Sequence, residues 1–166
     1  MKNISEKKWW EQVMKKDVLV SISGLHTDMM NPSDEQEPIE VIVPASYYYK
    51  NGKHYVMYEE PVEGSLQDVI KNRIKITGED LLEISKTGAT NAHMIFEKNK
   101  KNLTYYGTPY GQMLLGVDTT RMDIDMTEDH IHIAVDYQLD VNHEPMAECE
   151  IRMQSTSKDS GKFSLA

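Results

Sequence analysis

The chain has 166 residues, which is enough for one domain with a sizeable buried core. Its formal net charge of −9 argues against nucleic acid and anionic membrane surfaces as partners, because an acidic surface repels phosphate groups. Its one cysteine excludes an intramolecular disulfide. With no apolar stretch as long as a membrane span, the sequence predicts a soluble protein in a reducing, cytoplasmic setting.

Residues 1–16 differ from the rest, because lysines outnumber glutamates there and Trp9 and Trp10 are adjacent. Apolar residues follow each tryptophan at a spacing of four, which predicts a short N-terminal helix. A helix this short needs packing to persist, so we expect its tryptophans to plug an open end of the fold. A membrane or partner contact is the alternative. The main domain is then expected at 17–154, with a frayed tail at 155–166.

The remaining chain alternates short, half-apolar runs with turns, a pattern typical of antiparallel strands. Val, Ile, Thr and Tyr, which favour strands, are frequent in these runs. The connections are short, apart from a polar, acidic segment at 27–38 that we expect to be mobile. The predicted strands are 17–26, 39–50, 54–60, 67–77, 81–86, 92–98, 103–106, 112–126, 130–140 and 147–154.

Local signals add detail to this meander. Asn51-Gly52 predicts a type I′ hairpin turn, because both residues tolerate positive φ. Pro44 lacks a backbone N–H, so it marks a bulge or an edge position. Within the run 112–126 the apolar face changes from odd to even positions, which predicts a β-bulge near Asp118 to Thr120. This bulge and a bend at Gly107 to Gly111 are the expected edges of a mouth or pocket.

Roughly nine to ten strands without an internal helix predict an all-β fold. Short connections imply up-and-down order, and a sheet in that order closes most economically into a barrel. The sequence therefore predicts a single antiparallel up-and-down β-barrel, preceded by the short N-terminal helix.

Several segments also have an order and spacing that match a known family. They are Tyr48-Tyr49, Tyr55 to Glu60, Ile84 with Lys86 to Ala89, Met94 with Phe96, Thr108 to Gly111, and Ile131 to Val135 with Tyr137. In these segments the chain resembles the YwiB-like bacterial proteins, a domain of unknown function. The resemblance extends over about Val18 to Met153, while residues 1–16 and 27–38 are longer than the family pattern. It implies a lipocalin-like, calycin-type barrel and no particular activity.

Aromatic and methionine side chains suggest a binding site in such a barrel. Tyrosine combines an apolar body with a hydroxyl, and methionine adapts to irregular cavities. The leading hypothesis is therefore a barrel that binds a small apolar or amphipathic molecule in its lumen, with ordinary core packing as the alternative. The candidate residues of the lumen or its rim are Tyr47, Tyr49, Tyr55, Met57, Met94, Phe96, Tyr110 and Met113.

Metal and catalytic sites are weaker hypotheses. His130 and His132 share a strand face about 7 Å apart, a usable spacing for metal ligands. The apolar residues between them point to the core, so we expect both rings in water and no metal or cofactor. No nucleophile, base and oxyanion donor occur in a recognisable order, which makes an enzyme least favoured. The carboxylate pairs Glu59 with Glu60, Asp123 with Asp125, and Glu148 with Glu150 are expected on solvated faces.

A protein-interaction module is the second hypothesis. It would dock a partner, or a second copy in a homodimer, through the Trp9-Trp10 segment or through an exposed strand.

Overall fold

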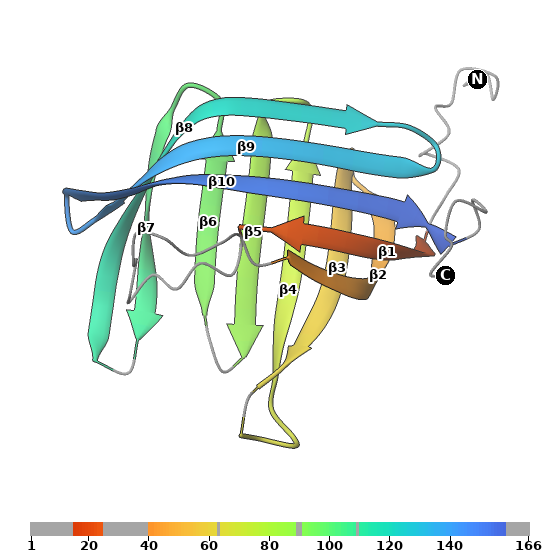
Figure 1. Cartoon of the computed structure of the whole chain (residues 1–166), viewed down its shortest axis with the longest axis horizontal. Coiled ribbons are helices and arrows are strands. Elements are labelled where there is room, and N and C mark those ends of the chain that lie inside the picture. The colour runs from red at the N-terminus through yellow and green to blue at the C-terminus, as the bar shows by residue number, and fades with distance from the viewer. Residues whose placement is uncertain (1–14, 25–39, 63, 89–90, 109, 159–166) are drawn as a thin grey trace.

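The computed structural model describes residues 15–24, 40–62, 64–88, 91–108 and 110–158, which form ten strands and no α-helix (Figure 1). The strands are β1 (Lys15–Ser23), β2 (Glu40–Lys50), β3 (Lys53–Pro61), β4 (Val69–Thr77), β5 (Leu81–Gly88), β6 (Ala92–Glu97), β7 (Lys101–Thr108), β8 (Gly111–Met126), β9 (His130–Val141) and β10 (Glu144–Ser157).

All ten strands belong to one antiparallel sheet in the order β6-β5-β4-β3-β2-β1-β10-β9-β8-β7. Neighbours in the sequence pair throughout, apart from β6 and β7, and the added pairing of β1 with β10 curls the meander round. Figure 1 shows β9, β10 and β1 crossing in front of β3 to β6. Where β6 and β7 meet, the described residues form one bridge, from Asn91 to Gly107. The predicted up-and-down barrel is therefore confirmed as a nearly closed barrel.

The predicted chain ends differ from the structure where they can be compared. Residues 1–14, 27–38 and 159–166 lie outside the described residues, and with them most of the predicted helix, the acidic connection and most of the tail. Lys15 and Lys16 begin β1, opposite Tyr48 and Tyr47. At the other end β10 continues to Ser157, which lies opposite Val18. The last inward residues of β10 are serines, so the apolar alternation that predicts a strand stops before the strand itself ends.

The core occupies the interior of the barrel, where alternate residues of consecutive strands meet. Burying one such large apolar side chain contributes roughly 1.5–3 kcal/mol. The largest fully buried side chains are Tyr47, Phe96, Ile22, Ile74, Ile76, Leu82, Leu115, Ile151, Val20, Val56, Val117 and Val135.

The local signals have the predicted consequences. Asn51 has φ of 54° and Gly52 has φ of 78°, which confirms a hairpin turn with two positive φ angles. The β8–β9 register shifts between Thr119 and Arg121, which confirms the bulge. Pro44 lies beyond the β2–β3 ladder, whose last pair is Ser46 with Met57, so β3 requires no N–H from it.

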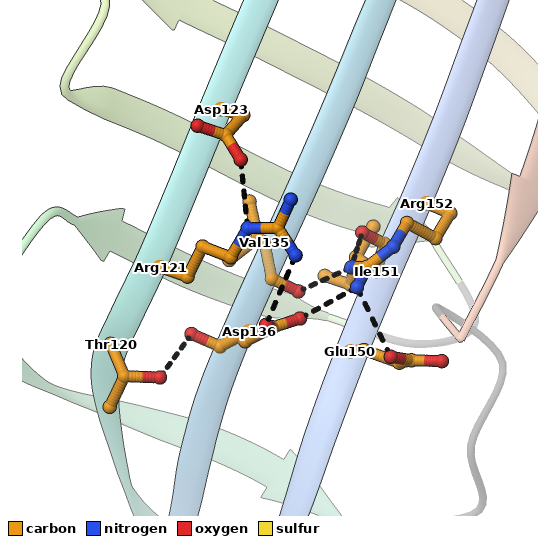
Figure 2. Close-up of polar contacts among 8 residues, drawn as sticks. All are labelled: Thr120, Arg121, Asp123, Val135, Asp136, Glu150, Ile151 and Arg152. Carbon is orange, nitrogen blue, oxygen red and sulfur yellow. Dashed lines mark hydrogen bonds and ion pairs between the residues drawn. The ribbon is translucent and has the colours of Figure 1, made fainter.

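Charged side chains link three strands on the outer face around Asp136 (Figure 2). Nη2 of Arg152 donates to Asp136 Oδ1 at 2.9 Å and to Glu150 Oε2 at 3.2 Å. Nε of Arg121 donates to Asp123 Oδ2 at 2.8 Å, and its Nη1 lies 3.9 Å from Asp136 Oδ2. These groups face water, so each pair adds little to stability. The network is best explained as surface charge pairing across β8, β9 and β10.

Candidate functional site at the open end of the barrel

Some inward-facing residues are only partly buried at each end of the barrel. Toward the Asn51-Gly52 turn, Tyr47, Ile76 and Phe96 are fully buried, whereas Tyr49, Ile124 and Met126 are partly buried. Toward the opposite end, the inward residues of several strands are only partly buried. We call this end the mouth, and its residues are Val43, Glu60, Ile70, Lys86, Val141 and Cys149. The connection from β7 to β8 lies at this end. The bulge at Thr120 lies farther along β8, toward the end that carries the Asn51-Gly52 turn.

Four polar side chains face inward on one wall of the mouth, and together they form the mouth cluster. Tyr58 lies opposite Asn72 in the β3–β4 ladder, and Asn72 lies opposite Lys86 in the β4–β5 ladder. Glu60 is two residues beyond Tyr58 on the same face of β3. Nδ2 of Asn72 donates to Glu60 Oε1 at 2.6 Å, and Nζ of Lys86 donates to the same oxygen at 2.8 Å. The carboxylate therefore holds two neighbouring strands' side chains in place.

Two polar atoms of the mouth cluster have no hydrogen-bond partner among the described residues. They are the hydroxyl of Tyr58 and the amide oxygen Oδ1 of Asn72. Tyr58 is 4% exposed and Asn72 is 0% exposed, so bulk water reaches neither. Burial, and then the charge of Glu60, raise the pKa of Tyr58, so its hydroxyl stays protonated and able to donate. Buried polar groups normally have partners, which makes this pair a candidate binding feature.

The ion pair of the mouth cluster is more accessible. The side chains of Lys86 and Glu60 are 18% and 19% exposed. An ammonium group has three N–H donors, and the described contacts use one of those of Lys86. Because the two charges compensate each other, the cluster offers hydrogen bonds without a large net charge.

The inward residues of the mouth that come from β2, β9 and β10 are apolar. Val43, Val141 and Cys149 are partly buried and pack against the core. Burial raises the pKa of the Cys149 thiol, which disfavours the nucleophilic thiolate. A molecule at the mouth would therefore meet both the polar mouth cluster and apolar side chains.

The candidate residues from the sequence occupy different places. Tyr47, Met94 and Phe96 are buried in the core, and Tyr49 contacts the ring of His54 from within. Tyr55 and Met57 alternate with buried residues of β3, so they lie on the outer face. Tyr110, 92% exposed, and partly buried Met113 are at the mouth end. The structure therefore does not bring these eight residues together, and a binding role for them stays a prediction.

Sequence reasoning missed the mouth cluster. Asn72 occupies an inward position between Ile70 and Ile74, and Lys86 follows Leu82 and Ile84 in the inward phase of β5. A polar residue in an apolar phase is a usable signal, because burial of an unpaired polar group is costly.

The two candidate metal ligands lie on the outer face of β9. The ring centroids of His130 and His132 are 4.7 Å apart. Nδ1 of His130 is 3.0 Å from the hydroxyl of Thr127, and Nε2 of His132 is 3.2 Å from Nε2 of Gln154. Within the described ranges, no three His, Cys, Asp or Glu side chains are grouped so that they could hold a metal ion. The same ranges contain no helix long and apolar enough to cross a membrane.

Comparisons with known proteins give a family and a fold. A family model described as a domain of unknown function, DUF1934, matches residues 24–153. The crystal structure of the ywiB protein from Bacillus subtilis is similar, with a TM-score of 0.69 and 18% sequence identity. The match covers 86% of this chain and 92% of that chain. No curated protein matches the sequence. At this identity the structural likeness shows a shared fold.

Proposed function

Because the chain belongs to the DUF1934 family of domains of unknown function, its role must be inferred from its own site, and we propose that it binds a small amphipathic molecule at the mouth of the barrel. The ligand's polar end lies against the mouth cluster, and its apolar part lies against Val43, Val141 and Cys149. This is a lipocalin-like use of a barrel, with the ligand at the rim of a largely filled interior.

The observation that carries the proposal is the pair of unpartnered atoms on Tyr58 and Asn72. Leaving a buried polar group without a hydrogen bond costs about 1–3 kcal/mol. A ligand that accepts from the Tyr58 hydroxyl and donates to Asn72 Oδ1 removes that cost for both groups. A hydroxyl or amide function on the ligand meets both requirements.

Binding is favoured over catalysis by the chemistry of the mouth cluster. Nζ of Lys86 lies 2.8 Å from Glu60 Oε1, so the amine is engaged in an ion pair and is not presented as a free nucleophile. Tyr58 has a raised pKa and is a poor general base. These groups suit recognition through hydrogen bonds better than proton transfer.

The test is native mass spectrometry of freshly purified protein, followed by a thermal-shift screen of small metabolites. We expect a bound mass or a stabilising ligand with the wild type, and loss of either with Asn72→Leu and with Tyr58→Phe. Tyr58→Phe is not expected to unfold the protein, because it removes only an unpartnered hydroxyl. Asn72→Leu also loses the hydrogen bond from Nδ2 to Glu60 Oε1, which should cost about 1.5–3 kcal/mol, so Tyr58→Phe is the cleaner of the two variants.

A matched control is Thr119→Val, which removes another buried hydroxyl without a described partner, farther from the mouth along β8. This variant should keep the ligand. The proposal is wrong if the wild type carries no ligand and gains none in the screen, or if Tyr58→Phe and Asn72→Leu bind as the wild type does.

A further inference from the structure

A hollow of about 620 Å³ lies on the outer wall of the barrel between β2 and β3. Its cause is the end of the β2–β3 ladder at Ser46 and Met57. Beyond this pair, β2 continues beside β1 and β3 continues beside β4, so the two strands separate. Pro44, which cannot donate a backbone hydrogen bond, stands on the hollow's rim.

The rim carries an excess of positive charge on an acidic protein. Lys15, Lys71 and Lys158 come from β1, from β4 and from the end of the chain beyond β10, and they face two carboxylates, Asp17 and Glu59. The chain as a whole has a net charge of −9. Lysines spread at random over such a surface would more often stand beside carboxylates than beside each other.

These three lysines have no ion-pair partner among the described residues. Lys75 and Lys101, by contrast, are each paired with a carboxylate. Three ammonium groups around one concave site repel each other, and an anion between them replaces that repulsion with attraction. Complementary charge therefore identifies the kind of ligand.

The inner surface of the hollow is less polar than its rim. The residues Pro44, Ala45, Tyr48 and Met57 line it. Tyr48 is stacked on Tyr55, with ring centroids 4.7 Å apart, which holds its ring in place. An apolar or aromatic body fits against this surface while its charged group remains with the lysines.

We propose that this hollow is a binding site for a small organic anion, a molecule with an apolar body and one acidic group. Tyr58 is common to the hollow and the mouth cluster, but the charged groups of the hollow lie on the outer face of the sheet and those of the mouth cluster lie on the inner face. The lysines supply positive charge at the rim on flexible side chains, so the site can accept a carboxylate, a phosphate or a sulfonate.

The experiment is a fluorescence titration with anilinonaphthalene sulfonate, with neutral N-phenylnaphthylamine as the uncharged probe. We expect the wild type to bind the sulfonate more tightly than the neutral probe, with an affinity that falls as salt rises. Lys71→Gln and Lys158→Gln should each weaken sulfonate binding by about threefold to tenfold, the range for an ionic contact worth up to about 1.4 kcal/mol. Neutral-probe binding should not change.

Two controls separate the alternatives. Lys50→Gln makes the same change in net charge at an exposed lysine outside the hollow, and it should leave the affinity unchanged. Lys86→Gln removes the cation of the mouth. If Lys50→Gln and Lys71→Gln weaken sulfonate binding equally, the loss of affinity follows from net charge and not from the hollow. Loss of binding with Lys86→Gln alone would place the probe at the mouth, and either result would overturn the proposal.

Discussion

A buried histidine is the residue whose ionisation most affects this fold. His54 is on the inner face of β3, and its Nδ1 lies 2.7 Å from the hydroxyl of Tyr47. Burial lowers the pKa of His54 from 6.5 to about 4. The ring is therefore neutral at pH 7 and can accept a hydrogen bond from the hydroxyl. Protonation would place an imidazolium inside the core, where the charged form is disfavoured.

We predict that His54 makes the barrel less stable in mild acid. Its pKa is lower in the folded chain, so between pH 6.5 and pH 4 the unfolded chain binds more protons. Stability is therefore complete above pH 6.5 and declines as the pH falls toward 4, by about 2 kcal/mol at pH 5. Urea denaturation at pH 7.5 and pH 5 measures this loss. His54→Gln should reduce it.

The control for this prediction is His132→Gln, because His132 is exposed on the outer face of β9. That variant should lose as much stability between the two pH values as the wild type does. An unchanged loss in His54→Gln would assign the acid sensitivity to other groups.

At the scale of the elements, β8 depends on one inserted residue. The bulge at Thr120 turns the second half of the strand, so that Met122, Ile124 and Met126 face the core. The hydroxyl of Thr120 donates to the carbonyl of Asp136 at 3.2 Å (Figure 2). A strand of 16 residues would otherwise direct one of its two apolar faces into water.

Deleting Thr120 should therefore unfold the barrel or destabilise it by more than about 4 kcal/mol, since three large apolar side chains exchange the core for water. Thr120→Ala keeps the residue count and loses only the hydroxyl contact, at a cost of about 0.5–1.5 kcal/mol. Circular dichroism and urea denaturation of both variants measure the difference. A deletion variant as stable as Thr120→Ala would mean that β8 accepts the alternative register.

The same elements explain what sequence can and cannot predict here. Period-two alternation identifies the strands, and the change of phase in β8 identifies the bulge, because both are properties of one segment. The mouth cluster depends on three strands at once, since Tyr58, Asn72 and Lys86 meet only when two ladders are in register. The alternation within β4 and β5 shows that Asn72 and Lys86 face inward. Their contact with Glu60 depends on how β3, β4 and β5 pair with one another, which no single segment encodes.

For the whole molecule, the weakest part is the join between the first and last strands of the sheet. The turn between β6 and β7 is fixed, because the amide of Lys98 donates to Asp80 O and that of Asn99 donates to Thr119 O. The other end has the bridge from Asn91 to Gly107. Between these points the described strands form no ladder. On β7, Nδ2 of Asn102 and Oγ1 of Thr104 are buried without a described partner.

We therefore predict that native-state hydrogen exchange is fastest, among the strands, in β6 and β7 and slowest in β9. Strand β9 is paired on both sides, whereas β6 and β7 each have a ladder on one side only. Amides without a ladder partner exchange through local opening rather than global unfolding. Mass spectrometry of peptides from these strands should give protection in β6 and β7 at least about tenfold lower than in β9. Equal protection would mean that β6 and β7 pair in solution and that the barrel closes at this join.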